Sequence, residues 1–462
     1  MSLQYTHIRL EQDFCPILAY EKLYRESPYS FLYESLESLG KRGRYSFIGA
    51  HPFQIFQSQG DEITIKLNGT VSHQKGNPVL VLRDLLNRYG NFPSIVPFCG
   101  GAVGYMAYDM IPFFEKVIHT NPDELGTPDS FFMFPSEVVV FDHKEKTVDI
   151  IVYSEQENKD RLNQLKEIIE TCTGNIQHPM IQENNRKLKL QSNFTEKDFC
   201  KIVAQAKEYI LAGDVFQVVL SQRFKFELQK DSFTVYKALR LTNPSPYMYY
   251  LNLNDHFVLG SSPEILVKLL GDQVTTRPLA GTRPRGQNFR EDRTLEEELL
   301  KDEKECAEHI MLVDLARNDI GRVCQYGTVR VTDLLQIERY SKVMHIVSNV
   351  VGKLKLPFDA FDVLAASFPA GTVSGAPKVR AMEIINELET IKRNIYAGSI
   401  GYFDFSGNMD MCIAIRTIVI KKKQGFIQAG AGIVADSIPK NEYQETINKA
   451  RALIHAIEMT GG

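Results

Sequence analysis

Tryptophan is absent from this sequence of 462 residues, and so are the features that mark several classes of protein. Lys and Arg number 53 against 57 Asp and Glu, a formal charge of −4, so the chain lacks the basic excess that holds a nucleic-acid backbone. No apolar run reaches the ~18 residues of a membrane helix, and the N-terminus lacks the basic-then-apolar layout of a signal peptide. We expect a protein that binds neither nucleic acid nor membrane.

Cysteine is sparse, with seven residues scattered along the chain and no CxxC motif. This usage is typical of reduced thiols in a cytoplasmic protein rather than of disulfides or a zinc site, so we expect a cytoplasmic location. HExxH, GxSxG and the dinucleotide fingerprint are also missing. The 44% of hydrophobic residues suits a globular protein with a large core.

The hydrophobic pattern predicts two modules. Residues 1–173 are expected to form strands and turns, with an Asn68-Gly69 hairpin and a helix at 159–173 that stops at Gly174. Residues 174–194 are polar and are predicted to be a linker. Residues 195–462 mix hairpins with long helices, which favours an α+β fold of antiparallel sheets covered by helices. The elements expected there are helices at 195–213, 294–315, 376–388 and 442–459, and strands at 215–226, 257–259, 265–270, 274–278, 400–405, 411–420 and 426–429.

Two Glu-x-x-Glu pairs, Glu305/Glu308 and Glu442/Glu445, fall in predicted helices. Residues three apart share a helix face, so each pair presents two carboxylates together. Two such faces across a cleft would supply the oxygen ligands that Mg²⁺ prefers. The alternative is that these are ordinary glutamates on exposed helix surfaces.

Three other features carry similar alternatives. His345 lies in an apolar run, either as a core histidine or as an acid–base group. Arg416 interrupts an apolar segment and needs an anionic partner, either a protein carboxylate or a substrate. The segment 371–378 resembles a phosphate loop but has Pro377 before Lys378, so it is either an anion-binding helix start or a turn.

Six segments together resemble the chorismate-utilising enzymes, and among them the large-subunit family (component I) of anthranilate synthases. They occur in the family's order: RPLAGTRPRG (277–286), AEHIMLVDLARNDIGRV (307–323), VMHIVSNVVG (343–352), FPAGTVSGAPKVRAM (368–382), YAGSIGYFDFSG (396–407) and QAGAGIVADSIPKNEYQETINKA (428–450). The resemblance implies an α/β/β/α sandwich of two stacked, largely antiparallel sheets. It also implies that a catalytic module, 195–462, is wrapped by a regulatory module, 1–173.

The same resemblance implies an Mg²⁺-dependent conversion of chorismate and ammonia to anthranilate and pyruvate, the first committed step of tryptophan biosynthesis. Glu308 and Glu445 would bind Mg²⁺ directly, and Glu305 and Glu442 would bind it through water. Glu305 is also the candidate acid for the leaving C4 hydroxyl. The other roles implied are catalytic for His345 and Thr372, and substrate-binding for Gly281, Thr282, Tyr396, Arg416, Gly432 and Lys449.

The choice of reaction within the family depends on the nucleophile. Some aminodeoxychorismate synthases carry Lys in the segment that here reads Pro278-Leu279-Ala280-Gly281-Thr282. Ala280 has no amine, so direct attack by ammonia is favoured. Aminodeoxychorismate synthase component I stays the alternative, followed by isochorismate or salicylate synthase. A homologue that only binds the metabolite is the third possibility, and the intact set of candidate residues argues against it.

The N-terminal segments 31–35 and 43–49 resemble the family's feedback site for L-tryptophan. The implied tryptophan-binding residues are Glu34, Ser35, Arg44, Asn243, Pro244, Ser245, Pro246, Tyr247 and Met248. The structural alternative is that these segments only build sheet edges. The chain has no recognisable glutamine amidotransferase segment, so we expect a hetero-oligomer in which a small amidotransferase subunit supplies ammonia.

Overall fold

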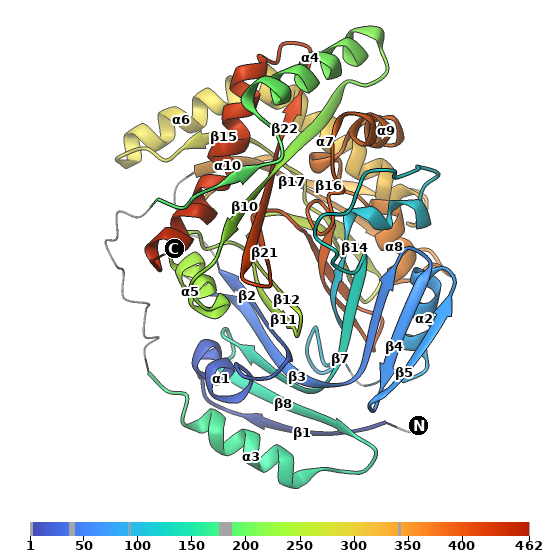
Figure 1. Ribbon diagram of the computed structural model, residues 1–462. Coiled ribbons are helices and arrows are strands. Elements are labelled where there is room, and N and C mark those ends of the chain that lie inside the picture. The colour runs from blue at the N-terminus through green and yellow to red at the C-terminus, as the bar shows by residue number, and fades with distance from the viewer. Residues whose placement is uncertain are drawn as a thin grey trace.

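The computed structural model describes residues 3–36, 42–90, 92, 94–174, 187–340 and 343–461 (Figure 1). Every strand pairing among them is antiparallel, and the pairings fall into two runs. The first run is β10 (Gln217–Glu227), β22 (Gln424–Ile433), β21 (Thr417–Lys421), β12 (His256–Ser262), β11 (Tyr247–Leu253), β2 (Tyr29–Leu36) and β3 (Arg42–Gln59).

The second run of paired strands forms the other sheet layer of the molecule. It comprises β6 (Gly101–Met106), β19 (Ser399–Asp404), β20 (Met409–Ile413), β13 (Ile265–Leu270), β14 (Gln273–Thr276) and β17 (Val343–Lys353), with β15 (Leu279–Pro284) and β16 (Arg330–Arg339) also paired to β17. Long strands β3 and β7 (Ser130–Asp142) join the two runs, because different halves of each pair with different neighbours.

The remaining strands extend these runs at their edges. They are β1 (Gln4–Leu10) and β8 (Thr147–Ser154) beside β7, β4 (Glu62–Leu67) and β5 (Thr70–Lys75) beside β3, and the two-residue strands β9 (Gln191–Ser192) and β18 (Gly375–Ala376) beside β10. The predicted hairpin at Asn68-Gly69 is confirmed, with positive φ at both residues as such a turn requires.

Helices cover the outer faces of the sheets. They are α1 (Pro16–Leu23), α2 (Pro78–Asn87), α3 (Lys159–Glu170), α4 (Glu196–Ala212), α5 (Ser232–Thr242), α6 (Phe289–Lys301), α7 (Glu303–Gly321), α8 (Ala360–Ser367), α9 (Lys378–Leu388) and α10 (Pro439–Met459), with short 3₁₀ turns η2 (Tyr108–Phe113) and η3 (Gly371–Val373). Side-chain caps start most of them; Thr195, for example, accepts from the backbone N–H of Asp198 at the start of α4.

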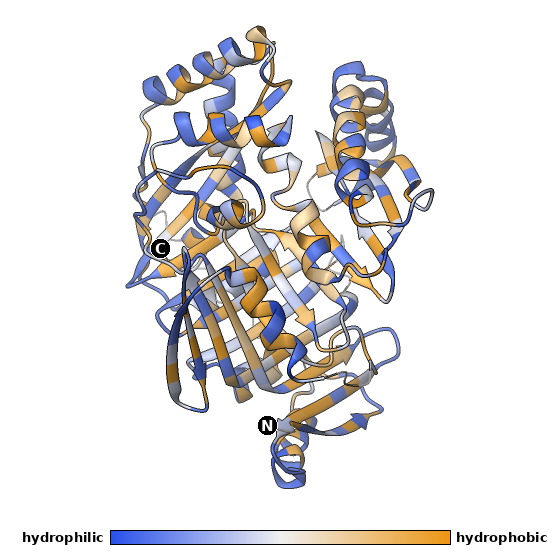
Figure 2. Cartoon of the chain, turned by 90° about the vertical axis from the view of Figure 1, so that its right-hand side faces the viewer, coloured by the Kyte–Doolittle hydropathy of each residue, from blue (hydrophilic) through white to orange (hydrophobic). Residues whose placement is uncertain are grey.

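Two large hydrophobic cores follow from this layering. One contains Phe31, Tyr249, Val267 and Met411, from strands of both runs. The other contains Leu32, Tyr250, Ile427 and Leu453, between the first run and helices such as α5 and α10. The strands are accordingly hydrophobic and the outer helix faces hydrophilic (Figure 2). The predicted α/β/β/α sandwich of α+β class is therefore confirmed in its layers.

Strands of the two predicted modules pair directly. β2 pairs with β11, and β6 pairs with β19, so segments 1–173 and 195–462 share sheets as well as a core. Most of the predicted linker, residues 175–186, lies outside the described residues. Within the part that is described, no helix is long and apolar enough to cross a membrane.

Two predicted elements are wrong in detail. The helix expected at 294–315 is two helices, because Asp302 ends α6 in an extended conformation and caps α7 by accepting from the backbone N–H of Glu305. The strand expected at 411–420 is broken at 414–416, where Arg416 has a left-handed φ of 51°. The first break lies three residues before Glu305 and the second lies at Arg416, so each changes where a charged side chain of the predicted site is presented.

Candidate active site

The two carboxylate pairs lie near the starts of helices α7 and α10. Glu305 has the Arg283 guanidinium at 3.3 Å, and Glu308 accepts from the side-chain amide of Gln217 at 2.8 Å. Burial, followed by the like charge of Glu308, raises the pKa of Glu305. Burial also raises the pKa of Glu442, with the neighbouring charge of Glu445 adding to it. Each pair is thus a partly desolvated anionic site that favours a cation.

The donor chemistry of these glutamates fits Mg²⁺, although the arrangement is not closed around an ion. The four ligands are carboxylate oxygens, which hard divalent cations prefer, and they come as two pairs on two helix faces. In the part of the chain that the structure describes, no group of three or more His, Cys, Asp or Glu side chains is gathered tightly enough to hold a metal ion. Instead, Glu308 accepts a hydrogen bond from the side-chain amide of Gln217, and Glu445 forms an ion pair with Lys449.

Cationic groups face the same region from α10, which carries Lys449, and from the β20–β21 connection, which carries Arg416. Lys449 bonds the Gly430 carbonyl at 3.0 Å and pairs with Glu445 at 2.7 Å. Within the described ranges, no carboxylate lies within 4 Å of the Arg416 guanidinium, and burial lowers its pKa. A partly buried guanidinium with no carboxylate at ion-pair distance among the described residues is available to a ligand carboxylate.

Tyr396 lies beside Arg416 in a second strained stretch of backbone. The next residue, Ala397, has a φ of 64°, and burial raises the pKa of Tyr396 to about 12. The phenol therefore stays protonated at neutral pH and can donate a hydrogen bond. Positive φ in non-glycine residues is costly and concentrates at functional sites, so the paired strain at Ala397 and Arg416 supports a binding role.

His345 is held by the bulged strand pair β15–β17. Gly281 has a φ of 62° and sits at a register shift, which turns its carbonyl toward His345 Nδ1 at 3.0 Å. Burial lowers the pKa of His345 to about 4, so the ring is neutral at physiological pH. The hydroxyl of Thr282 lies 3.0 Å from the same nitrogen. Ala280 is buried beside this pair, on β15.

Two residues that the sequence analysis missed complete the region. Glu264, between β12 and β13, is 6% exposed, and burial raises its pKa to about 8. It lines a small cavity together with Thr372. Gln217 is the other: its amide bonds Glu308, and a Cβ on Gly432 would come within 2.6 Å of that amide nitrogen. The sequence spacing could not have predicted either residue. The raised pKa of Glu264 depends on its burial, and the contact of Gln217 with Glu308 depends on how the strands pair.

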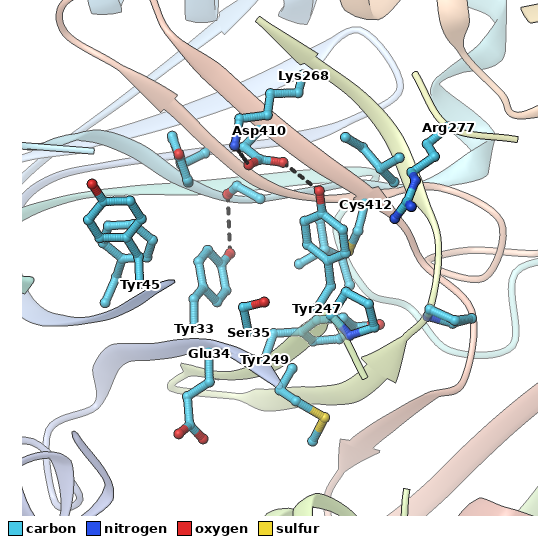
Figure 3. Close-up of a pocket in the computed structure, with 18 of the residues that line it drawn as sticks. Tyr33, Glu34, Ser35, Tyr45, Tyr247, Tyr249, Lys268, Arg277, Asp410 and Cys412 are labelled. Atoms are coloured by element: carbon cyan, nitrogen blue, oxygen red, sulfur yellow. Dashed lines mark hydrogen bonds and ion pairs between the residues drawn. The ribbon is translucent and has the colours of Figure 1, made fainter. Parts of the chain in front are cut away.

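A separate cavity of about 320 Å³ lies between the sheets. Its walls are largely aromatic, with Tyr33, Tyr45, Phe47 and Tyr402 among the lining residues. Figure 3 shows Asp410 inside it, paired with Lys268 at 2.8 Å and accepting from the Tyr247 hydroxyl at 2.9 Å. A preformed apolar slot with a few convergent polar groups is typical of ligand sites.

The predicted tryptophan residues are only partly brought together here. Glu34, Ser35, Arg44, Pro246, Tyr247 and Met248 line this cavity, whereas Asn243, Pro244 and Ser245 do not. The Glu34 carboxylate points away from the cavity (Figure 3) and is bound by Arg240 at 2.9 and 3.1 Å and by the Tyr236 hydroxyl at 2.8 Å. Glu34, one of the implied tryptophan-binding residues, therefore presents its carboxylate to Arg240 and not to the cavity, because alternate strand residues face opposite sides of the sheet.

Met248 is a second correction of the same kind. It pairs with Glu34 across β2 and β11, and it packs in the core on the helix side of the sheet. Tyr33 and Tyr247 face the cavity instead. The Tyr33 hydroxyl donates to the Gly401 carbonyl at 3.1 Å, so its ring crosses from one sheet to the other.

Comparison with known proteins places these features in a family. A model of the chorismate binding enzymes matches residues 27–455. The chain belongs to that family. It is 48% identical to anthranilate synthase component 1 of Acetivibrio thermocellus, covering 95% of this chain and 92% of the relative. It is 47% identical to the same component of Aquifex aeolicus, covering 98% and 94%.

Solved structures agree with the fold. Anthranilate synthase component I from Streptococcus pneumoniae superposes with a TM-score of 0.80 at 40% identity, covering 95% of this chain and 97% of that one. The menaquinone-specific isochorismate synthase of Escherichia coli superposes at 0.75 with 21% identity, over 99% and 94%, and supports the fold alone. The resemblance to the component I family of anthranilate synthases is thereby confirmed.

Proposed function

We propose that this chorismate binding enzyme converts chorismate and ammonia to anthranilate and pyruvate. The observation that carries the proposal is the neutral His345, on the strand paired with that of Ala280, near a partly buried Arg416 that has no carboxylate within 4 Å among the described residues. Chorismate is a dianion. Its enolpyruvyl carboxylate can accept hydrogen bonds from the charged guanidinium of Arg416 and from the neutral hydroxyl of Tyr396. Lys449 adds local positive charge that the net charge of −4 does not supply.

Mg²⁺ is proposed to bind Glu308 and Glu445 directly, with Glu305 and Glu442 held to it through water. When bound, it supplies positive charge for the ring carboxylate. Gln217 orients Glu308 from the floor of the site, which fixes one ligand in advance. Gly432 has no side chain, which leaves room for that amide.

Departure of the C4 hydroxyl needs a proton donor. Glu264 fits this task better than Glu305, because its pKa of about 8 keeps the carboxyl protonated at neutral pH. Ammonia adds to C2, the ring double bonds shift, and the C4 oxygen leaves as water with the proton from Glu264. The ammonium group formed at C2 then loses one proton to solvent. Ala280 leaves C2 open to ammonia, because position 280 carries no amine that could attack C2.

Elimination then restores the aromatic ring. A base takes the C2 proton and the C3–oxygen bond breaks, releasing the enol of pyruvate. His345 is the candidate base. Its Nδ1 donates to the Gly281 carbonyl, because a carbonyl oxygen only accepts, and this leaves the lone pair on Nε2 for the proton.

L-tryptophan is proposed to bind the aromatic cavity and inhibit the enzyme. Tyr33, Tyr45 and Phe47 would enclose the indole. Asp410 would receive the amino group that Glu34 cannot reach. The cavity shares strands with the catalytic region: Leu279 and Val347 line it, while Gly281 and His345 lie two residues away on β15 and β17.

A small amidotransferase subunit is the proposed partner, since relatives of this chain are named as one component of a synthase. The decisive experiment incubates the purified chain with chorismate, Mg²⁺ and an ammonium salt and identifies products by fluorescence and mass. Anthranilate and pyruvate in equal amounts are expected. Glutamine should be used only after the small subunit is added. Formation of 4-aminodeoxychorismate or isochorismate would overturn the assignment.

A further inference from the structure

A cavity of about 20 Å³ lies between the sheet formed by β10, β21 and β22 and the segment that leads into β19. Arg223 of β10, Thr417 of β21 and Gln428 of β22 line it from the sheet. Arg393 and Tyr396 line it from the segment before β19, and the rest of the lining is apolar. Two guanidinium groups thus line a cavity that has no acidic side chain among the described residues of its wall.

Only one of these two arginines has a counter-ion within the part of the chain that the structure describes. Arg393 donates to the Glu389 carboxylate at 2.6 and 2.9 Å. Arg223 is 3% exposed, and it donates to uncharged oxygens: the side chains of Gln428 and Asn394, each at 3.0 Å, and a main-chain carbonyl. Its Nη1 has no hydrogen-bond partner among the described residues.

Arg223 is therefore a buried cation of the kind that is costly unless an anion neutralises it. Burial lowers the pKa of the guanidinium to about 10, so the group is still charged at neutral pH. The negative charges of Glu124 and Asp109 offset only part of this effect, because they act from a distance. An anion bound at Nη1 would supply the missing counter-charge and the missing hydrogen-bond acceptor together.

The volume and the walls restrict what that anion is. A water-sized particle needs roughly 10–15 Å³, so the cavity has room for one monatomic ion and not for a tetrahedral oxyanion. Phe426, Val419 and Ile395 supply apolar walls, which leave no space or partners for the water shell of a strongly hydrated ion. The fit is to a single halide ion that exchanges its water shell for the guanidinium.

We propose that a single chloride-sized anion binds in this cavity against Arg223 Nη1 as a structural counter-ion. Arg223 also donates to the Lys392 carbonyl and to the side chain of Asn394. The anion therefore helps to fix the turn that carries Tyr396, one of the candidate substrate-binding residues. The inference concerns binding and does not depend on which reaction the enzyme catalyses.

Bromide tests the site directly, because it can replace chloride and scatters X-rays anomalously. Crystals of the wild-type protein are soaked in sodium bromide, and data are collected at the bromine absorption edge. We expect an anomalous peak within about 3.5 Å of Arg223 Nη1. Electron density there without an anomalous signal would be water and would overturn the proposal, and so would an empty cavity.

Melting temperature gives a test in solution. The protein is compared in sodium chloride and in sodium gluconate, whose anion is too large for the cavity, at the same ionic strength of about 0.2 M. The wild type should melt about 2 °C higher in chloride, because a ligand that binds only the folded chain stabilises it. Arg223→Gln should lose this difference, whereas Arg317→Gln, at an exposed arginine of α7, should keep it.

Val419→Ile guards against misfolding of Arg223→Gln. It adds one methylene group to the wall of the cavity and leaves Arg223 in place, so it should also reduce the difference between the two salts. A chloride effect of wild-type size in both variants would be a general salt effect and would contradict the proposal. Equal melting temperatures of the wild type in the two salts would contradict it as well.

Discussion

His345 donates from Nδ1 to the main-chain carbonyl of Gly281 at 3.0 Å. The contact exists because Gly281 takes a left-handed φ at a strand bulge, which an L side chain rarely adopts. It fixes the tautomer of a neutral imidazole and leaves Nε2 unprotonated. One bulge thus sets the tautomer and orientation of the histidine that we propose as the base.

Replacing His345 with Met removes this base and keeps the apolar volume. We expect pyruvate release to slow more than ring amination, so that the amino-enolpyruvyl intermediate accumulates. Rapid-quench sampling with mass detection would follow both species. Thr282→Val is the control, since its hydroxyl touches the same nitrogen without being required as a base. Parallel loss of amination and elimination in His345→Met would contradict the role.

Glu264 and Glu305 compete for the role of acid, and pH separates them. With Glu264 protonated below about pH 8, kcat/KM for chorismate at constant free ammonia should fall as pH rises through about 8. Glu264→Gln should lose most activity. Glu305→Gln should still show the decrease of kcat/KM as pH rises through about 8. If Glu305→Gln abolishes the pH dependence, Glu305 is the acid.

Glu264 also makes stability depend on pH. Its folded-state pKa of about 8 exceeds the ordinary value of 4.5, so the folded chain binds the extra proton between those values. Stability should therefore fall as pH rises from about 5 to about 8 and level off above that, by roughly 1.4 kcal/mol per pH unit at most. Glu264→Gln should flatten this slope in urea unfolding. An identical slope in the variant would show that another group titrates.

Glu308→Gln and Glu445→Gln should each lose at least tenfold in apparent Mg²⁺ affinity, because each removes one anionic ligand from a site with few to spare. Activity titrated against free Mg²⁺ in chelator-stripped buffer measures this, and circular dichroism checks the fold. Glu298→Gln, an exposed glutamate of α6, is the control. Wild-type Mg²⁺ dependence in both variants would refute the metal assignment.

Ser35→Leu should relieve inhibition by tryptophan, because the larger side chain occupies the aromatic cavity. Coupling of this kind is typically worth ~1–3 kcal/mol, a several-fold to hundred-fold change in chorismate affinity. Asp410→Asn should also weaken inhibition, whereas Ser245→Ala, outside the cavity, should not. Inhibition assays and the tryptophan-induced shift in melting temperature measure this. A wild-type enzyme that shows neither effect has no such site.

Local sequence patterns predicted which helices and strands carry the candidate site, but they predicted the residues at which those elements begin and end less well. Spacing placed Glu305 and Glu308 on one helix face, and they share α7. The break at Asp302 was missed although Asp302 precedes Glu305 by three residues, a capping distance. The sequence around Glu34 could not show which way its carboxylate points, because both faces of β2 are buried and hydrophobicity does not alternate there.

The sequence by itself determined the family, the layered α+β class and the type of group at each candidate catalytic position, since motifs and helix periodicity are local properties of the chain. Only the tertiary structure decided how those groups behave. Burial raised the pKa of Glu264, and strand register turned Glu34 onto Arg240. Packing of α7 against the 371–373 turn left a small cavity that Glu264 and Thr372 line. Desolvation, side-chain direction and empty space all depend on neighbours far apart in the chain, which is why no local pattern contains them.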